Sequence, residues 1–166
     1  MDWKDIDTTH CGVAACAELI GDYWSILILR DILAGVTKFG DLQKHTGVST
    51  AVLSKRLKHL VEADILEAIE YKRSGLRARI EYTITKKGLN LVPVIVAMGQ
   101  FGYDQLIAPA DRLVEYLDSQ TKQHLRVGFL REDGQEVELQ NLSLRITPNA
   151  YVPEYQALPS RKRPKG

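Results

Sequence analysis

The most constraining feature of this sequence is a one-sided apolar helix pattern over residues 50–63. At about 100° per residue, its three leucines fall within one narrow stripe, at Leu53, Leu57 and Leu60. Ser49 comes directly before the pattern and can cap the helix, because its hydroxyl can accept a backbone N–H of the first turn. Such a helix must lie on a core through its leucine stripe and leave the opposite face to solvent or to a partner.

Two strand-like runs follow this helix directly and predict a β-hairpin. The first covers residues 65–72, and the second covers residues 79–85, in which Ile80, Tyr82 and Ile84 alternate to one side. The tip between the runs contains a glycine, as hairpin loops often do. The tip is also basic, because it carries Arg73 and Arg77.

Three shorter helices are predicted before this segment, over residues 14–20, 23–34 and 38–45. The second is apolar on nearly every side, which indicates a central, buried helix. Asp22 and Thr37 are expected to cap the second and third helices. Gly35 and Gly47 are expected to end them, because glycine readily adopts the left-handed conformation of a helix C-terminus.

The remainder of the chain predicts one long helix and then a smaller, mixed segment. Thr85 is expected to cap the long helix over residues 86–106, which Pro93 should kink or locally open. Beyond Pro109 we expect a helix over residues 111–120. Two strand-like runs should follow, over 125–129 and 137–146, with a turn between them at Asp133-Gly134. The tail over 151–166 is expected to be disordered.

The charge distribution indicates a polyanion as partner. The net charge of the 166 residues is only +1, but residues 38–88 carry 11 basic and 6 acidic residues, an excess of +5. A mixed, solvated surface is the alternative interpretation. The apolar fraction of 45% and charged fraction of 26% exclude a wholly disordered chain, and no apolar run is long enough for a membrane span. With two cysteines and an acidic, polar N-terminus, the expected location is the cytoplasm of a prokaryote-like cell.

The outer face of the 50–63 helix carries hydrogen-bond donors, as a helix that enters the DNA major groove must. The candidate DNA-binding residues are Lys38, Ser49, Thr50, Ala51, Ser54, Lys55, Lys58, Arg73 and Arg77. In this interpretation the 50–63 helix contacts base edges, and the hairpin tip over residues 72–79 contacts the backbone or the minor groove. The alternatives are an ordinary amphipathic helix beside a surface hairpin, or a winged-helix protein–protein interaction module that binds no DNA.

Several motifs in order resemble the HxlR-type winged-helix transcriptional regulators, which are related to the MarR class. The resemblance covers residues 11–105 and rests on Cys11-Gly12-Val13-Ala14, Leu19-Ile20-Gly21-Asp22-Tyr23-Trp24, Leu27-Ile28-Leu29-Arg30-Asp31, Lys38-Phe39-Gly40-Asp41-Leu42, Val52-Leu53-Ser54-Lys55-Arg56-Leu57 and Glu81-Tyr82-Thr83-Ile84-Thr85-Lys86-Lys87-Gly88. It implies a homodimeric regulator of transcription that binds double-stranded operator DNA and dimerises through its terminal helices. Two departures are Gly12, where the family usually has proline, and Thr50-Ala51, where it often has proline and a basic residue.

Together these observations predict an α+β, mainly helical fold: a winged helix-turn-helix core with a long C-terminal dimerisation helix and an appended helix and β-hairpin. The expected divisions are a DNA-binding domain with its dimerisation helix over residues 1–108, an extension over 109–150 and a basic tail over 151–166. Two recognition helices related by a two-fold axis would read half-sites about 34 Å apart, so a palindromic operator is expected.

Cys11 is the candidate regulatory residue. The resemblance implies that a cysteine before the first helix senses electrophiles or oxidants, and a helix N-terminus favours the reactive thiolate. The alternatives are a buried small hydrophobe at Cys11, or control by a small apolar ligand at the dimer contact. A Cys11–Cys16 disulfide would join positions roughly 140° apart on one helix, so oxidation would favour an intermolecular bond across the dimer instead. Cys16 is expected in the core.

The sequence predicts no enzyme, no cofactor and no metal site. It contains no glycine-rich phosphate loop, no nucleophile elbow and no paired zinc-ligand motif. The four histidines, His10, His45, His59 and His124, do not have the spacing of metal ligands.

Overall fold

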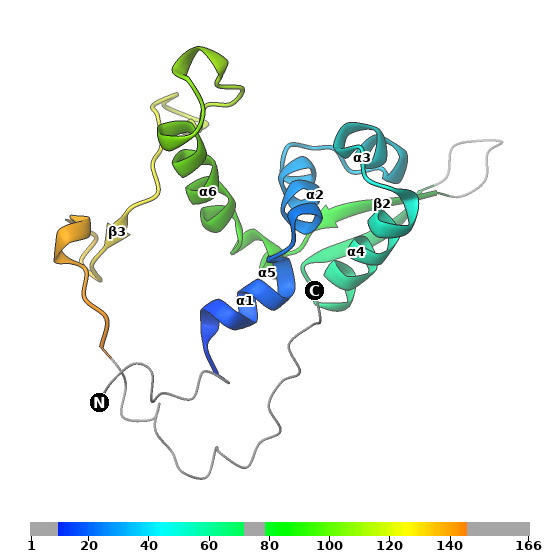
Figure 1. Cartoon of the computed structure of the whole chain (residues 1–166), viewed down its shortest axis with the longest axis horizontal. Coiled ribbons are helices and arrows are strands. Elements are labelled where there is room, and N and C mark those ends of the chain that lie inside the picture. The colour runs from blue at the N-terminus through cyan, green and yellow to red at the C-terminus, as the bar shows by residue number, and fades with distance from the viewer. Residues whose placement is uncertain (1–9, 72–78, 146–166) are drawn as a thin grey trace, which may run out of the picture. The chain divides into compact units, whose positions relative to one another are not determined.

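The computed structural model describes residues 10–71 and 79–145. The chain divides into two units, of which one is Ile20–Gly128 and the other combines residues 1–19 and 129–166. Figure 1 shows the order of the elements along the chain. The domain divisions at residues 108 and 150 stay predictions.

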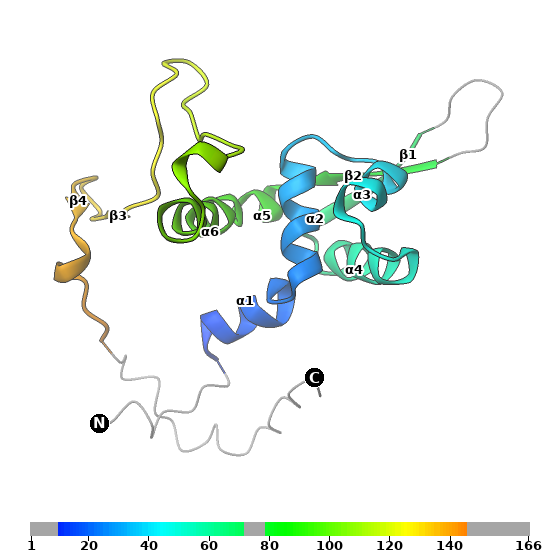
Figure 2. The same ribbon diagram turned by 45° about the horizontal axis from the view of Figure 1, so that its top comes forward.

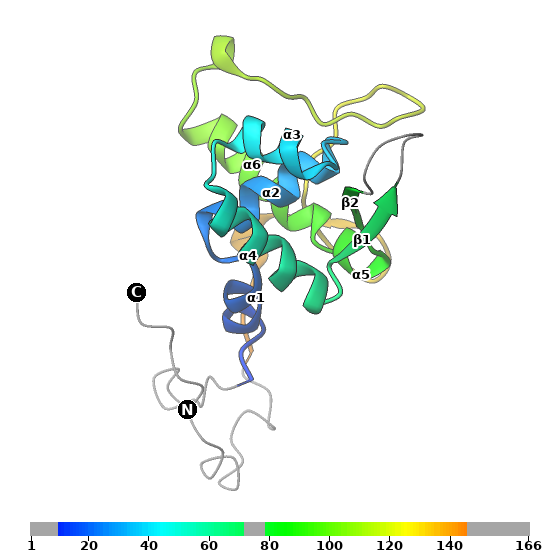
Figure 3. The same ribbon diagram turned by 90° about the vertical axis from the view of Figure 1, so that its right-hand side faces the viewer.

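Three helices build the core of the Ile20–Gly128 unit: α2 (Tyr23–Leu33), α3 (Phe39–Thr46) and α4 (Thr50–Glu62). Helix α2 is central, as predicted, because it contacts α3, α4, the hairpin and α6 (Figure 3). The buried apolar side chains come from all three helices and from the entry to the hairpin: Ile28, Leu29, Ile32, Leu42, Val48, Leu53, Leu57, Leu60, Ile65 and Leu66.

Capping side chains fix where α2 and α4 begin. Asp22 accepts hydrogen bonds from the N–H groups of Trp24 and Ser25, both at 3.1 Å. Ser49 accepts the N–H of Val52 at 3.4 Å. Both predicted caps are therefore confirmed, and so are the left-handed glycines after α2 and α3, with φ of 90° at Gly35 and 73° at Gly47.

The predicted cap of α3 at Thr37 is wrong. Lys38 holds the N-cap position and makes no capping bond with its side chain. Thr37 instead accepts the N–H of Tyr82 through its carbonyl at 2.8 Å. This bond ties the chain before α3 to the hairpin, and α3 therefore begins one residue later than the side-chain pattern indicates.

The predicted hairpin is confirmed in its two strands. Strands β1 (Leu66–Tyr71) and β2 (Arg79–Ile84) form an antiparallel hairpin (Figure 2). Their register runs from the pair Leu66 and Ile84 to the pair Tyr71 and Arg79. The predicted basic tip, with Arg73 and Arg77, lies outside the described residues.

The helix predicted over residues 86–106 is not continuous: the chain forms two helices there, and the break just before Pro93 agrees with the opening predicted at this proline. Thr85 caps α5 (Lys86–Leu89) by accepting the N–H of Gly88 at 3.0 Å. Helix α6 (Val92–Gln105) then begins anew with Pro93 in its first turn. Proline is tolerated at this place because the first N–H groups of a helix have no acceptor within the helix.

The predicted helix over residues 111–120 is also wrong. A 3-10 turn at Pro109–Asp111 is followed by a hairpin-like loop in which Leu117 pairs with His124. The Asp118 carboxylate accepts the N–H groups of Gln120 and Thr121 at 2.8 and 2.6 Å. An aspartate that bonds to the backbone just after it favours a turn over a helix.

Helix α1 (Gly12–Ile20), which belongs to the second unit except for its last residue, begins two residues earlier than predicted. The turn at Asp133-Gly134 is confirmed by the antiparallel pairing of β3 (Phe129–Leu130) with β4 (Glu136–Val137). These strands are much shorter than the strand-like runs predicted over 125–129 and 137–146, and a 3-10 turn at Leu139–Asn141 interrupts the second. Within the described ranges, no single helix is long and apolar enough to cross a membrane, although α1 and α2 taken together as a bent pair meet the length and composition requirements.

Candidate nucleic-acid interface

Helix α4 has the two faces that its sequence predicts. The side chains of Leu53, Leu57 and Leu60 are at most 1% exposed and fix the helix on α2 and β1. The opposite face is open to solvent along the helix and at its first turn. It presents the predicted residues Ser49, Thr50, Ala51, Ser54, Lys55 and Lys58, all of which are exposed.

The first turn of α4 is joined to α3 by a side-chain hydrogen bond. The amide nitrogen Nε2 of Gln43 donates to the hydroxyl of Thr50 at 2.7 Å. The bond couples the two helices at the exposed N-terminal end of α4, and it orients the Thr50 hydroxyl. The sequence analysis did not select Gln43. The feature that could have indicated it is its position in the preceding helix, seven residues before Thr50.

The other side of α4 is joined to the start of α2. The guanidinium Nε of Arg56 lies 3.1 Å from Oδ1 of Asp22, and both side chains are about two-thirds or more buried. Arg56 occurs in one of the motifs that carry the family resemblance, but sequence reasoning gave it no role. It is a positioning residue, because it holds α4 against the helix on which α4 rests.

Lys58 has one weak partner. Its ammonium Nζ lies 3.6 Å from Oε1 of Glu62, one turn further along α4, and both side chains are more than half exposed. Exposed pairs of this kind contribute about 0.3–0.5 kcal/mol, so Lys58 can exchange Glu62 for a phosphate at little cost.

Lys38 lies apart from the outer face of α4, beside β2 and near the end of the hairpin strands from which the tip extends. Its ammonium Nζ is 5.7 Å from the centre of the Tyr71 ring, and its backbone pairs with that of Glu81. A concavity of about 470 Å³ at this place is also lined by Arg79 and Asp41. Arg79, the first residue of β2, is therefore a cation of the hairpin that the sequence analysis did not select, while Arg73 and Arg77 lie outside the described residues.

A buried carboxylate joins α2 to α3. Asp31 is 1% exposed, and its two oxygens contact the guanidinium of Arg30 at 2.7 Å and Nδ1 of His45 at 2.6 Å. A buried charge is costly unless it is paired, so these contacts keep Asp31 in place. Through His45 they also fix the last turn of α3, just before the turn that leads to α4.

Cys11 stands at the start of α1. Its carbonyl accepts the N–H of Ala15 at 3.0 Å, and its free thiol belongs to a half-buried residue. Cys16, which the sequence placed in the core, is also only half-buried. Across the described part of the chain, no group of three or more histidine, cysteine, aspartate or glutamate residues could hold a metal ion.

The helices α2, α3 and α4, followed by the hairpin of β1 and β2, define a winged helix-turn-helix protein. The sequence model of the HxlR-like helix-turn-helix family matches residues 19–109. The chain therefore belongs to this family, as the motifs indicated.

Relatives and solved structures agree with this placement. An uncharacterized HTH-type transcriptional regulator of Mycobacterium tuberculosis is 37% identical over 97 residues, which are 58% of this chain and 60% of the relative's length. A relative of the same description from Synechocystis is 33% identical over 60% of this chain and 74% of its own length. The crystal structure of PA1607, named as a candidate transcription factor, has a TM-score of 0.70 at 32% identity and covers 81% of this chain and 94% of its own.

Proposed function

We propose that this protein is a homodimeric, sequence-specific DNA-binding regulator of transcription. The observation that carries the proposal is helix α4, whose leucine face is buried while its outer face is exposed and bears Ser54, Lys55 and Lys58. A major groove about 12 Å wide admits one such helix. The names of the relatives as transcriptional regulators support the same conclusion.

In this proposal α4 reads base edges and the hairpin binds the backbone. Ser49, Thr50 and Ala51 enter the groove first, because recognition helices commonly use their N-terminal residues. The helix N-terminus also favours a phosphate at this end. Lys55 and Lys58 supply donors along the groove, whereas Lys38 contacts phosphate beside the hairpin. Arg73 and Arg77 belong to the proposal on the sequence alone, and replacing either should lower the salt slope by about one unit.

The dimer would form through α6. This helix exposes an apolar stripe of Val94, Met98 and Phe101, which are 39%, 46% and 62% exposed. At about 100° per residue these three side chains lie within roughly 60° of one another. A contiguous apolar face on an exposed helix favours a partner of the same kind, and a two-fold dimer would require a palindromic operator.

Control would act through the thiol of Cys11, with a small electrophile or oxidant as the signal. Its position at the start of a helix supports this, because the helix N-terminus favours a thiolate. Treatment with an aldehyde or an oxidant should change operator affinity in the wild type and leave Cys11→Ser unaffected. An equal response in Cys11→Ser would contradict thiol control and leave an apolar ligand at the dimer contact as the alternative. The proposal includes no enzymatic activity.

The test of the proposed function is selection of bound genomic fragments by the reduced protein. We expect a palindromic sequence to be enriched and to bind far more tightly than mixed-sequence DNA at the same salt concentration. If no sequence is enriched in either the reduced or the aldehyde-treated protein, the proposal is wrong and a protein-docking role for the winged helix takes its place.

A further inference from the structure

A cavity of about 600 Å³ lies between α6 and the chain that follows it, within the Ile20–Gly128 unit. Its volume is within the 300–1,000 Å³ that is typical of small-molecule sites. One wall comes from α6 through Gln100, Tyr103 and Asp104. The other comes from the segment after Pro109, which lies mostly beyond the family match.

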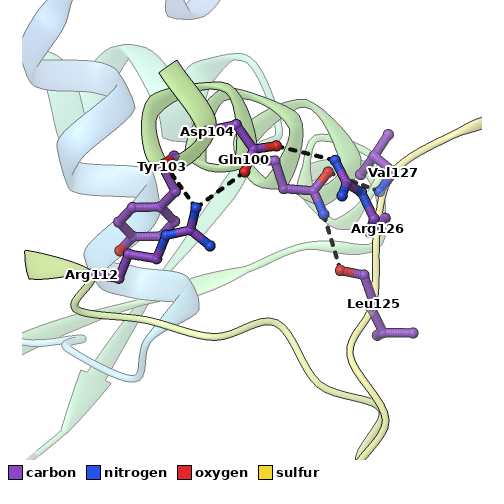
Figure 4. Close-up of polar contacts among 7 residues, drawn as sticks. All are labelled: Gln100, Tyr103, Asp104, Arg112, Leu125, Arg126 and Val127. Atoms are coloured by element: carbon purple, nitrogen blue, oxygen red, sulfur yellow. Dashed lines mark hydrogen bonds and ion pairs between the residues drawn. The ribbon is translucent and has the colours of Figure 1, made fainter. Parts of the chain in front are cut away.

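The wall opposite α6 is held by the side chain of Gln100, which makes two hydrogen bonds to its backbone, as a neighbouring β-strand would. Nε2 of Gln100 donates to the carbonyl of Leu125 at 3.0 Å, and its Oε1 accepts the N–H of Val127 at 3.0 Å (Figure 4). The two bonds satisfy backbone groups on either side of residue 126. They fix this backbone against α6 and so keep the cavity open between the two walls.

Asp104 holds two arginines at the same place. Its Oδ1 lies 3.3 Å from Nη2 of Arg112, and its Oδ2 lies 3.1 Å from Nη2 of Arg126 (Figure 4). Arg112 also donates to the carbonyl of Tyr103 at 3.0 Å. Each guanidinium has five N–H donors, and these contacts use only the Nη2 end of each. The remaining donors of both arginines are available to a second carboxylate.

Two tyrosines give the cavity an aromatic side. The guanidinium carbon of Arg112 lies 5.9 Å from the centre of the Tyr103 ring. The hydroxyl of Tyr116 occupies space that a side chain at Gly99 would fill. Burial, and secondly the coulombic effect of Tyr103, raise the pKa of Tyr116 above its ordinary value. As a neutral phenol, Tyr116 can donate a hydrogen bond from its hydroxyl. Leu113 and Leu125 add apolar surface.

Donor geometry, and not net charge, sets the preference of this cavity for an anion. Glu115 also lines it, so the charges of Arg112 and Arg126 are balanced by those of Asp104 and Glu115 when His124 is neutral. Bidentate binding by arginine nevertheless distinguishes a carboxylate from a neutral amide, because both oxygens accept charge-assisted hydrogen bonds.

We propose that this cavity binds small organic carboxylates with an aromatic or apolar body. Their carboxylate would bind the free donors of Arg112 and Arg126, and their body would lie against Tyr103 and Tyr116. On α6 the cavity residues Gln100, Tyr103 and Asp104 lie roughly 90° or more from the centre of the exposed stripe of Val94, Met98 and Phe101. A ligand there would leave the proposed dimer face open, and its binding does not depend on whether the protein binds DNA.

The test is calorimetric titration of the full chain with benzoate and phenylacetate. Each is compared with its primary amide and with an amine of the same body. We expect one carboxylate per chain, with a dissociation constant of about 1 mM or lower and at least about tenfold tighter binding than the amide. No saturable binding of either carboxylate, or equal binding of the amides or the amines, would overturn the proposal.

Substitutions of the charged cavity residues test whether the carboxylate binds at this place. Arg112→Gln and Arg126→Gln should each weaken carboxylate binding by about tenfold, whereas Arg131→Gln, a matched change outside the cavity, should leave it unchanged. Asp104→Asn should tighten binding, because it removes a negative charge that lies beside both guanidinium groups and repels a second carboxylate. A purely structural role for Asp104 would weaken binding instead. Unchanged affinity in both cavity arginine variants, or weaker binding in Asp104→Asn, would contradict the assignment.

Discussion

A single oxygen atom, Oδ1 of Asp22, caps α2 and also contacts Arg56 of α4. It accepts the N–H groups of Trp24 and Ser25 at 3.1 Å each and lies 3.1 Å from the guanidinium Nε. The start of the central helix and the position of the candidate recognition helix therefore depend on one carboxylate. The outer face of α4, which we propose reads DNA, is held in place by this polar contact as well as by the leucines on the opposite face.

Replacing Asp22 should lower the free energy of unfolding more than replacing Arg56 does. Asp22→Ala removes both the cap and the ion pair and should lower the free energy of unfolding by about 1–3 kcal/mol. Arg56→Ala removes only the ion pair of a partly exposed side chain and should cost about 1 kcal/mol or less. Urea denaturation of the two variants and of the double variant measures the coupling. Fully additive losses would contradict a direct Asp22–Arg56 contact.

Two glycine-to-alanine changes should have opposite effects on stability. A Cβ atom at Gly88 would overlap with the backbone carbonyl of Ile65 and with the side chain of Ile84. Gly88→Ala should therefore lower the free energy of unfolding by about 1–3 kcal/mol. Gly40 lies in α3 with open space around it, so Gly40→Ala should raise stability by about 0.5–1 kcal/mol. Thermal unfolding of both variants checks this pair, and equal destabilisation would contradict the packing at Gly88.

Charges on the apolar stripe of α6 should produce a monomer. Met98→Lys and Phe101→Lys place an ammonium on side chains that are 46% and 62% exposed in one chain, so the fold should tolerate them. A dimer that buries the stripe should not tolerate these lysines, because burying an unpaired charge in an interface is costly. Ile69→Lys, on the exposed side of β1, is the control and should stay dimeric. Light scattering distinguishes the states, and dimers of unchanged affinity in both α6 variants would exclude this face.

The turn after residue 117 should respond to acid. The backbone N–H groups of Thr121 and Gln120 bond to the Asp118 carboxylate, and these bonds lower its pKa below the ordinary value. A lowered folded-state pKa means that the stabilisation is present above the unfolded-state pKa and is lost as pH falls through the folded-state value. NMR titration of the Asp118 carboxyl carbon should give the lowered pKa, with the Thr121 amide shifting in parallel. An ordinary pKa would show that these bonds do not form in solution.

The sequence predicted the winged core well because local signals there agree with tertiary packing. The leucine stripe of α4, the caps at Asp22 and Ser49 and the glycine after α3 each depend on nearby residues, and the structure has all of them. The strands of the hairpin were predictable for the same reason.

The failures occur where one side chain or one distant backbone contact decides the outcome. Helical spacing continues through residues 86–106, but Pro93 fits only in a first turn, so the helix begins anew at Val92. Residues 111–120 have helical spacing, but they form a turn instead of a helix because the Asp118 carboxylate bonds to the backbone just after it. The contacts Asp22–Arg56, Gln43–Thr50 and Asp31–His45 join residues 7–34 positions apart, and periodicity carries no information about such pairs.

The measurement that tests the central claim most directly is operator affinity of the double variant Lys55→Ala, Lys58→Ala. Both lysines are exposed on α4, so the variant should keep the wild-type melting temperature. Fluorescence anisotropy on the selected duplex at several salt concentrations should show at least about a tenfold loss of affinity and a shallower salt dependence. The control Lys86→Ala, exposed at the start of α5, should bind like the wild type. Wild-type affinity and salt slope in the double variant would show that α4 is not the DNA-reading helix.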